Sequence, residues 1–126
     1  MSIKILSKSP KETFNLGMTI ARHCKPGDII CMEGNLGAGK TTLTQGIAAG
    51  LNINAKSVVS LTFVFLNIYN GTLTVYHFDL YRLENLQELF NIGYEEFFYS
   101  SGLAVIEWAE RLKTLKPKQY LKIELK

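Results

Sequence analysis

The chain has 126 residues, the length of a single domain with a hydrophobic core of its own. We therefore expect residues 1–126 to form one domain. The apolar fraction of 47% and the charged fraction of 20% are those of an ordinary soluble globular protein. The net charge of +3 is too small to predict nucleic-acid binding by itself.

Cysteine usage and hydropathy exclude further classes of protein. Cys24 and Cys31 are too few and too far apart for a zinc site or a disulfide framework. Cys31 lies inside an apolar run, so we expect it to be a small buried side chain. The sequence has neither an apolar stretch long enough to span a bilayer nor a cationic start followed by an apolar signal core. We therefore expect a cytoplasmic protein that does not associate with membranes.

The first part of the chain predicts a short strand followed by a helix. Residues 4–6 (KIL) are a possible strand. Ser9 is a candidate N-cap, Pro10 suits the first helical position, and Glu12 completes a capping box. These residues predict a helix from about Pro10 to Cys24.

A buried strand and an amphipathic helix come next. The run Ile29–Met32 (IICM) shows no polar alternation, which is typical of a strand covered on both faces in a parallel or mixed sheet. Leu43, Ile47 and Leu51 fall four residues apart and predict the core face of a helix that ends near Gly50.

The second half of the chain predicts a hairpin, a broken helix and two further strands. Two strand-like runs, 62–69 and 72–79, flank an Asn-Gly pair, which is a strong signal for a β-hairpin. Residues 83–100 are expected to be helical in two pieces that break at a glycine. Residues 103–108 are uniformly apolar up to a glutamate and predict a buried strand, and the alternating run 120–126 predicts an edge strand. This alternation of strands and helices predicts an α/β fold of three layers.

A glycine-rich segment directly after the first buried strand carries the clearest chemical signal. Residues 34–41 (GNLGAGKT) match the phosphate-binding pattern G-x-x-x-x-G-K-[ST]. Glycines allow several backbone N–H groups to turn toward an anion, and the helix that follows adds its positive N-terminus. Lys40 can then reach the β- and γ-phosphates of a nucleoside triphosphate, and the Thr41 hydroxyl can bind Mg²⁺. The residues of this segment that we expect to bind nucleotide are Asn35, Leu36, Gly37, Ala38, Gly39, Lys40, Thr41 and Thr42.

Three strands end in a carboxylate at what we expect to be one edge of the sheet. Ligands of open α/β sheets lie beyond the carboxyl ends of the strands. Asp79 and Glu107 are the candidates for binding Mg²⁺ and for orienting the attacking water, and spacing alone does not rank the two roles. The alternative for either residue is a carboxylate that caps the following helix. We expect Glu33 to be structural, because it precedes the loop.

Three neighbouring side chains have alternative interpretations. Arg82 could contact the γ-phosphate or form a salt bridge with Asp79. His77 lies in a strand, and we expect it to be a hydrogen-bonded packing residue rather than a catalyst. Trp108 follows a candidate site carboxylate, and it either covers the site or packs in the core.

Taken together, these motifs resemble those of the TsaE (YjeE) family, the small bacterial P-loop ATPases of tRNA threonylcarbamoyladenosine synthesis. The matching segments occur in order between about residues 9 and 112. Of these, HFDLYR and EW discriminate best, because generic P-loop proteins do not combine them at this spacing. The segments are GDIICMEGNLGAGKTTLTQGIA, SLTF, HFDLYRL, ELFNIGYEEF and VIEWAERL.

The resemblance implies a P-loop NTPase-like fold with a mixed, mostly parallel sheet, which binds ATP with Mg²⁺ and hydrolyses it slowly. It also implies that TsaB and TsaD homologues are the partners that activate hydrolysis, and that contact with tRNA is only indirect. By position, Lys40 and Thr41 correspond to the phosphate and metal residues, and Thr62 of SLTF to a catalytic switch threonine. The pair Asp79 and Glu107 then supplies catalysis and metal binding.

Two details complete what the resemblance implies. Trp108 belongs to the same motif as the glutamate before it and counts among the expected nucleotide-binding residues. The family usually has proline at the position of Leu61, so the loop that carries the switch threonine should be less preordered here.

Two other functions stay open from the sequence. A small-molecule kinase would also begin with a phosphate loop, but it usually needs an arginine-bearing lid, and the chain has few arginines. A nucleotide-responsive binding module is the other possibility: it would change shape through the switch segment and would not need to catalyse a useful reaction. GTP is disfavoured because no N-K-x-D motif occurs. The lysine-rich end could touch tRNA, although a solvated face is the more frequent explanation of such a run. Its lysines are Lys113, Lys116, Lys118, Lys122 and Lys126.

Overall fold

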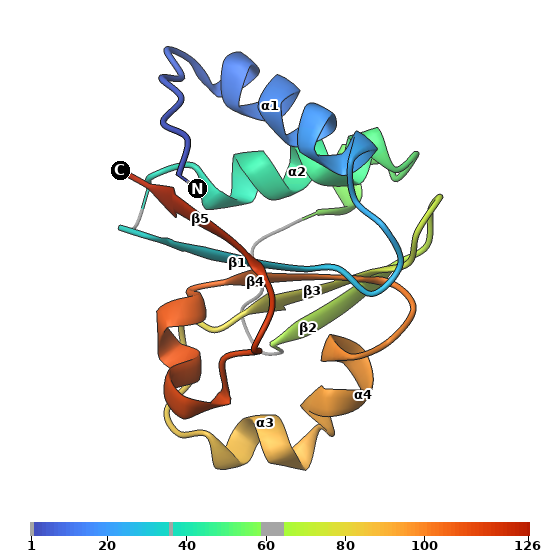
Figure 1. Cartoon of the computed structure of the whole chain (residues 1–126), viewed down its shortest axis with the longest axis vertical. Coiled ribbons are helices and arrows are strands. Elements are labelled where there is room, and N and C mark those ends of the chain that lie inside the picture. The colour runs from blue at the N-terminus through green and yellow to red at the C-terminus, as the bar shows by residue number, and fades with distance from the viewer. Residues whose placement is uncertain (1, 36, 59–64) are drawn as a thin grey trace.

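The computed structural model describes residues 2–35, 37–58 and 65–126. Its strands are β1 (Ile29–Gly34), β2 (Leu66–Tyr69), β3 (Val75–Asp79), β4 (Leu103–Glu107) and β5 (Leu121–Leu125). Within these residues they form one sheet in the order β2-β3-β4-β1-β5, in which only the β2–β3 pair is antiparallel (Figure 1). The predicted α/β fold with a mixed, mostly parallel sheet is confirmed.

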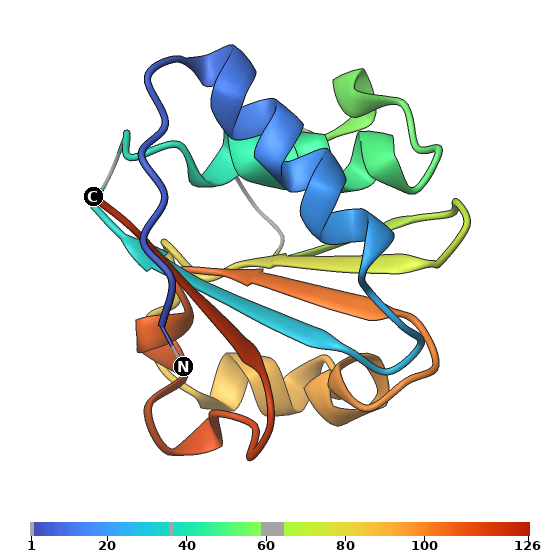
Figure 2. The same ribbon diagram turned by 45° about the horizontal axis from the view of Figure 1, so that its top comes forward.

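Helices cover both faces of the sheet and complete three layers. One face carries α1 (Pro10–Arg22), α2 (Lys40–Gly50) and the short 3₁₀ helix η1 (Ala55–Ser57). The other face carries α3 (Gln87–Asn91), α4 (Tyr94–Phe98) and the 3₁₀ segment η2 (Ala109–Leu115), as Figure 2 shows. None of the helices in the described part of the chain is long and apolar enough to cross a membrane.

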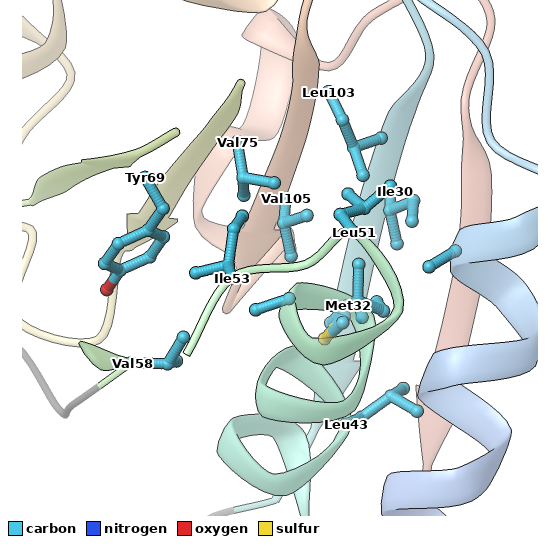
Figure 3. Packing of buried hydrophobic residues seen from close by; sticks show 13 residues of the cluster. Ile30, Met32, Leu43, Leu51, Ile53, Val58, Tyr69, Val75, Leu103 and Val105 are labelled. Carbon is cyan, nitrogen blue, oxygen red and sulfur yellow. The ribbon is translucent and has the colours of Figure 1, made fainter. Parts of the chain in front are cut away.

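Two apolar clusters separate the layers, and the strands β1 and β4 contribute to both. Successive side chains of a strand point to opposite faces, so Ile30, Met32 and Val105 pack toward the α2 side (Figure 3). Their neighbours Cys31 and Ile106 pack on the opposite side. Because both faces are covered, these strands show no polar alternation, and Cys31 is fully buried as expected.

The start of α1 follows the predicted capping only in part. The Ser9 hydroxyl accepts the Glu12 N–H at 3.1 Å, so the N-cap is confirmed. The Glu12 carboxylate, however, accepts a hydrogen bond from the N–H of Lys8, one residue before the position that a capping box requires. The predicted strand at residues 4–6 is wrong: this segment is neither helix nor strand, and its side chains are exposed.

The antiparallel hairpin is confirmed, but its connection is longer than a two-residue turn. The last residue of β2, Tyr69, pairs with Val75. A tertiary contact explains the difference, because Thr72 donates its N–H to the Leu51 carbonyl at 2.8 Å. A side chain on Gly71 would place its Cβ 2.3 Å from the same oxygen. The Gly of the Asn-Gly pair therefore allows close approach to the end of α2.

The remaining elements follow the sequence expectations. The helical stretch after β3 breaks at Gly93, whose φ of 70° lies in the left-handed region. All residues of β4 are buried, as expected for a strand between two others. The final strand β5 lies at the edge of the sheet and is parallel to β1.

Two glycines allow α1 to lie directly on α2. A Cβ on Gly17 would be 2.5 Å from the Leu43 carbonyl oxygen, and one on Gly46 would be 2.1 Å from the Phe14 carbonyl oxygen. Real Cβ atoms do not approach backbone oxygens this closely. The short distance between the two helix axes therefore depends on glycine, which has no side chain, at both positions. This contact fixes α2, the helix that follows the glycine-rich loop.

We predict that Gly46→Ala destabilises the protein. Alanine gains about 1 kcal/mol over glycine in a helix interior, but overpacking against backbone that cannot move costs about 1–3 kcal/mol, and we expect the clash to dominate. The measurement is urea unfolding followed by circular dichroism. Asn15→Ala, at an exposed position of α1, is the control and should leave stability unchanged or slightly higher. An equally stable Gly46→Ala variant would contradict the proposed role of the contact.

Candidate functional site

The glycine-rich segment forms a loop between β1 and α2 at the carboxyl edge of the sheet. Gly34, Gly37 and Gly39 have φ angles of 149°, 81° and 107°, in the region that favours glycine. At Gly34 a second constraint applies, because a Cβ there would lie 2.3 Å from the Leu125 carbonyl oxygen of β5. Leu36, one of the expected nucleotide-binding residues, lies outside the described residues.

The N-terminus of α2 opens onto this loop without a capping side chain. Gly39 is the N-cap residue and has no side chain to accept a hydrogen bond, and the first turn of α2 contains no acidic residue. The Ala38 N–H donates to the Asn35 carbonyl at 3.1 Å, which closes the loop. Uncapped N–H groups at the start of a helix attract anions, and the helix dipole adds to the attraction.

Lys40 is the first residue of α2, next to the loop, and is 5% exposed. Its ammonium donates to the carbonyls of Gly34 and Asn35 at 2.6 Å and 2.8 Å, and it lies 4.0 Å from the centre of the Trp108 ring. Burial lowers the pKa of Lys40, and the nearby carboxylates oppose that shift. An ammonium held beside uncapped N–H groups makes the loop suitable for a polyanion.

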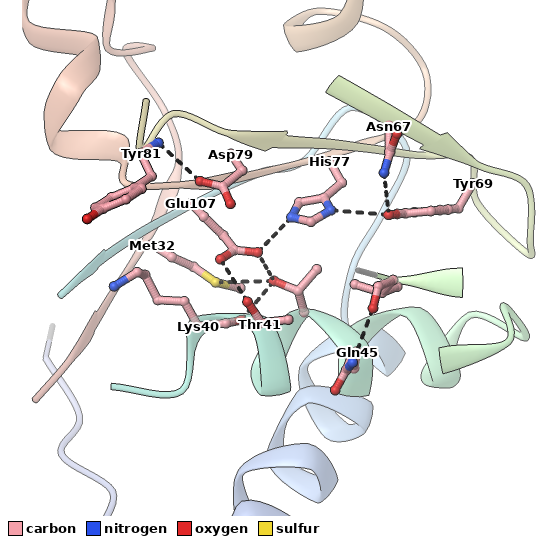
Figure 4. Close-up of polar contacts among 12 residues, drawn as sticks. Met32, Lys40, Thr41, Gln45, Asn67, Tyr69, His77, Asp79, Tyr81 and Glu107 are labelled. Carbon is pink, nitrogen blue, oxygen red and sulfur yellow. Dashed lines mark hydrogen bonds and ion pairs between the residues drawn. The ribbon is translucent and has the colours of Figure 1, made fainter. Parts of the chain in front are cut away.

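The two predicted carboxylates lie side by side at the ends of neighbouring strands. Asp79 and Glu107 are register partners in the parallel pair β3–β4. Glu107 is 2% exposed, and its Oε1 accepts from the Thr41 hydroxyl at 3.5 Å. Its Oε2 accepts from the Thr44 hydroxyl at 3.2 Å and from His77 Nε2 at 2.6 Å (Figure 4). The structure therefore brings Thr41, Glu107 and Asp79 together beside the loop.

Asp79 has a different environment from Glu107. It is partly exposed, and its Oδ1 accepts the Tyr81 N–H at 3.1 Å. Burial raises the pKa of Asp79, and the Glu107 charge raises it further. The Tyr81 hydrogen bond and the positive charges of the site lower it, but the net shift is upward.

The donor set at this edge fits Mg²⁺. Within the described residues, no three or more His, Cys, Asp or Glu side chains cluster in a way that could hold a metal ion by themselves. Mg²⁺ needs no such cluster, because it keeps several waters and is usually bound through one or two carboxylates together with substrate phosphates. Two carboxylates and the Thr41 hydroxyl next to an anion-binding loop match this requirement.

Trp108 lies beside the loop, in contact with Lys40. Its φ of 59° is in the left-handed region, which turns the chain between β4 and η2. The ring packs at 4.9 Å from the Tyr81 ring, and the Arg111 guanidinium lies 5.7 Å from its centre. This arrangement places Trp108 at the site rather than in either apolar cluster alone.

Other predicted residues lie apart from the site. Glu33 is structural as expected, because its carboxylate pairs with Lys116 at 2.9 Å. Lys122 pairs with Glu124 at 3.0 Å, so part of the lysine-rich end is engaged within the chain. Arg82 is exposed and forms no ion pair with Asp79 in the described part of the structure.

Thr62 and Leu61, the residues of the predicted switch segment, lie outside the described residues. The role of this segment therefore stays a prediction.

A large open cavity of about 1030 Å³ lies at the opposite edge of the sheet and is separate from the loop. It is lined by the starts of β1 and β5 and the end of α1.

The sequence interpretation missed one side chain of the site and the hydrogen-bond partner of a second. Thr44 was not singled out, although it follows Thr41 by about one helical turn and so shares its face. His77 was expected to be a hydrogen-bonded packing residue, and the hydrogen bond is present. What the sequence did not reveal is that its partner is Glu107. The available signal was the spacing of His77 and Asp79, which places both on one face of β3.

A glycine-rich loop between a buried parallel strand and a helix, at the carboxyl edge of an α/β sheet, defines a protein of the P-loop fold class. Comparison with known families specifies the class further. The family model described as "Threonylcarbamoyl adenosine biosynthesis protein TsaE" matches residues 7–126. The chain belongs to the TsaE family.

Relatives support this assignment over nearly the whole chain. The tRNA threonylcarbamoyladenosine biosynthesis protein TsaE of Treponema pallidum is 38% identical, with 98% of this chain and 91% of the relative covered. The TsaE protein of Bacillus subtilis is 40% identical, with 98% and 77% covered. The crystal structure of Bacillus subtilis YdiB matches with a TM-score of 0.73 at 35% identity, covering 94% of this chain and 72% of that one.

We predict that Asp79→Asn raises the stability of the protein without nucleotide at pH 7. A raised pKa means that the folded state disfavours the ionised carboxylate, and asparagine removes that cost while its oxygen can still accept from Tyr81. The stability difference should shrink as the pH falls toward the ordinary pKa of aspartate, where the wild-type side chain also becomes neutral.

Thermal unfolding of both proteins at several pH values measures this effect. Asp28→Asn, at an exposed turn where the carboxylate accepts the Lys25 N–H, is the matched control and should not stabilise the protein. A lower melting temperature for Asp79→Asn at pH 7 would show that the charge stabilises the fold.

Proposed function

We propose that this chain is an ATP-binding, slowly hydrolysing subunit that supports threonylcarbamoyladenosine modification of tRNA. The observation that carries the proposal is the register pairing of Asp79 with Glu107 beside Thr41 and the phosphate loop. A loop alone would support binding of an anion. The adjacent carboxylates add the groups that metal-assisted hydrolysis requires.

In the proposed site, the backbone of residues 34–39, the Lys40 ammonium and the start of α2, including Thr42, bind the phosphates of ATP. Thr41 and Glu107 are the residues that would hold Mg²⁺ directly, and Asp79 would contact it only through water. Bound Mg²⁺ neutralises charge on the phosphates. The preference for ATP over GTP rests on the family and on the lack of an N-K-x-D motif in the sequence.

The contacts of the two carboxylates favour different roles for them. Glu107 is buried and directs Oε1 toward the metal-binding threonine, which suits a metal ligand. Asp79 is partly exposed and its pKa is raised, which suits a group that orients a water molecule and accepts its proton. We propose this assignment for the pair that sequence spacing left unranked.

Partners complete the proposal. The names of the relatives place them in tRNA threonylcarbamoyladenosine biosynthesis. By the family resemblance, TsaB and TsaD homologues in the cytoplasm are the partners of this chain, and tRNA is contacted only through them. The nucleotide cycle of this chain then supports turnover of the partner complex.

We predict that the protein binds ATP in the presence of Mg²⁺ and that Lys40→Ala weakens binding at least tenfold, or about 1.4 kcal/mol. The reason is the loss of an ammonium that lies against the backbone of the loop. Isothermal titration calorimetry measures the affinity, and a thermal melt checks the fold. Lys56→Ala, which removes an exposed lysine of η1, should bind as the wild type does. No heat of binding with the folded wild-type protein would exclude the proposed site.

We predict that purified TsaB and TsaD from the same organism raise the ATPase rate and associate with this chain in an ATP-dependent manner. Asp79→Asn should keep ATP binding but lose on the order of 10²-fold in hydrolysis, the usual contribution of a positioned general base. Pull-down and phosphate-release assays measure the two effects. If ATP binds but the partners change neither association nor rate, the proposed cellular role is wrong. Phosphate transfer to an acceptor faster than hydrolysis would instead indicate a kinase.

A further inference from the structure

Behind Glu107 lies a line of hydrogen bonds that crosses three strands. Asn67 Nδ2 lies 3.2 Å from the Tyr69 hydroxyl, which lies 3.4 Å from His77 Nδ1. On the other side of the ring, His77 Nε2 lies 2.6 Å from Glu107 Oε2 (Figure 4). The side chains of His77 and Glu107 are 1% and 3% exposed, so water does not compete for this contact.

The chemistry of the groups allows one consistent direction of donation along this line. A carboxylate oxygen only accepts, so Nε2 of His77 carries a proton. When the second ring nitrogen, Nδ1, carries no proton, it accepts from the Tyr69 hydroxyl, and the hydroxyl oxygen accepts from the Asn67 amide. Every group in this line has a role that its chemistry allows.

The other donor to Glu107 Oε2 has competing acceptors. The Thr44 hydroxyl has a single proton, and it lies 2.9 Å from the Lys40 carbonyl, 3.2 Å from Glu107 Oε2 and 3.6 Å from Met32 Sδ. Its proton can reach only one of them at a time. Among the described residues, His77 is therefore the donor to Oε2 whose proton has no competing acceptor.

A dedicated donor matters because the terminal torsion of glutamate is soft. The rotation that exchanges the two carboxylate oxygens has broad minima, so the side chain alone does not set which oxygen faces Thr41. A hydrogen bond at 2.6 Å on Oε2 holds that oxygen away from the loop and leaves Oε1 toward the Thr41 hydroxyl. The alternative is that His77 only satisfies the hydrogen-bonding needs of a buried carboxylate. In that case its removal would not change Mg²⁺ binding.

We propose that His77 is a positioning residue that holds Glu107 in the orientation required for Mg²⁺ binding with ATP. The inference rests on the proposed function. Side chains that orient a metal ligand through a hydrogen bond typically contribute roughly ten- to hundredfold to metal affinity. His77 acts through Glu107 and contacts neither phosphate nor metal.

The test compares two amide substitutions of similar polarity. In His77→Gln the amide can take the place of Nε2 and donate to Glu107, whereas the amide of His77→Asn reaches only the place of Nδ1. At fixed ATP, the Mg²⁺ concentration for half-maximal binding should rise roughly tenfold or more in His77→Asn. It should stay within about threefold of wild type in His77→Gln, because the donor is kept. Affinity for ATP in EDTA should be equal in all proteins.

The fluorescence of Trp108, the single tryptophan of the chain, reports binding because its ring lies over Lys40. His23→Asn, at the exposed second histidine, is the control and should leave the Mg²⁺ dependence unchanged. Equal Mg²⁺ dependence in His77→Asn, His77→Gln and wild type would overturn this inference but not the proposed function. Absence of ATP binding by wild type, with and without Mg²⁺, would overturn the proposed function and this inference with it.

A measurement on the wild-type protein keeps the inference testable if His77→Asn does not fold. Long-range ¹H–¹⁵N correlation spectra distinguish the two neutral forms of an imidazole. We expect the form protonated on Nε2, with an Nε2 proton that shifts when Mg²⁺ is added to the ATP complex. A ring protonated on Nδ1 alone, or an Nε2 proton indifferent to Mg²⁺, would contradict the role of His77.

Discussion

The site depends on the register of three parallel strands. Met32 of β1 pairs with Glu107 of β4, and Glu107 pairs with Asp79 of β3, so both carboxylates lie level with the exit of β1 into the loop. This register is strongly determined, because both faces of β4 are buried. A slip of one residue would turn Glu107 into the apolar cluster on the far face and Ile106 toward α2. Core packing therefore fixes the positions of the catalytic candidates.

A buried carboxylate is costly unless donors surround it, and the fold supplies donors from two layers. Thr41 and Thr44 reach Glu107 from α2, and His77 reaches it from β3. The hydrogen bonds thus connect the helix to the sheet at the point where the loop ends. The glycine contact between α1 and α2 also helps to position α2 over the sheet, because it sets how closely α1 can approach α2. The site and the packing of this layer constrain each other.

Local chemistry explains which features the sequence could predict. The loop, the N-cap at Ser9 and the break at Gly93 depend on residues close in the chain, and each is present. The predictions that failed or stayed incomplete depend on contacts across the fold. The turn after β2 is lengthened by contact with Leu51, and the partner of His77 is known only once β3 is placed beside β4. Spacing gives the face of a strand, but it does not identify the neighbouring strand.

The difference between the two carboxylates follows from the same geometry. Both end neighbouring strands at one level, yet only Glu107 is covered by α2, whose hydroxyls lie within reach of its two oxygens. Asp79 lies one strand farther along the sheet order and is partly exposed. In the proposed site, this position leaves one carboxylate fixed for a metal and the other accessible to water. In that proposal, two side chains of similar chemistry have separate roles because a single helix covers one of them.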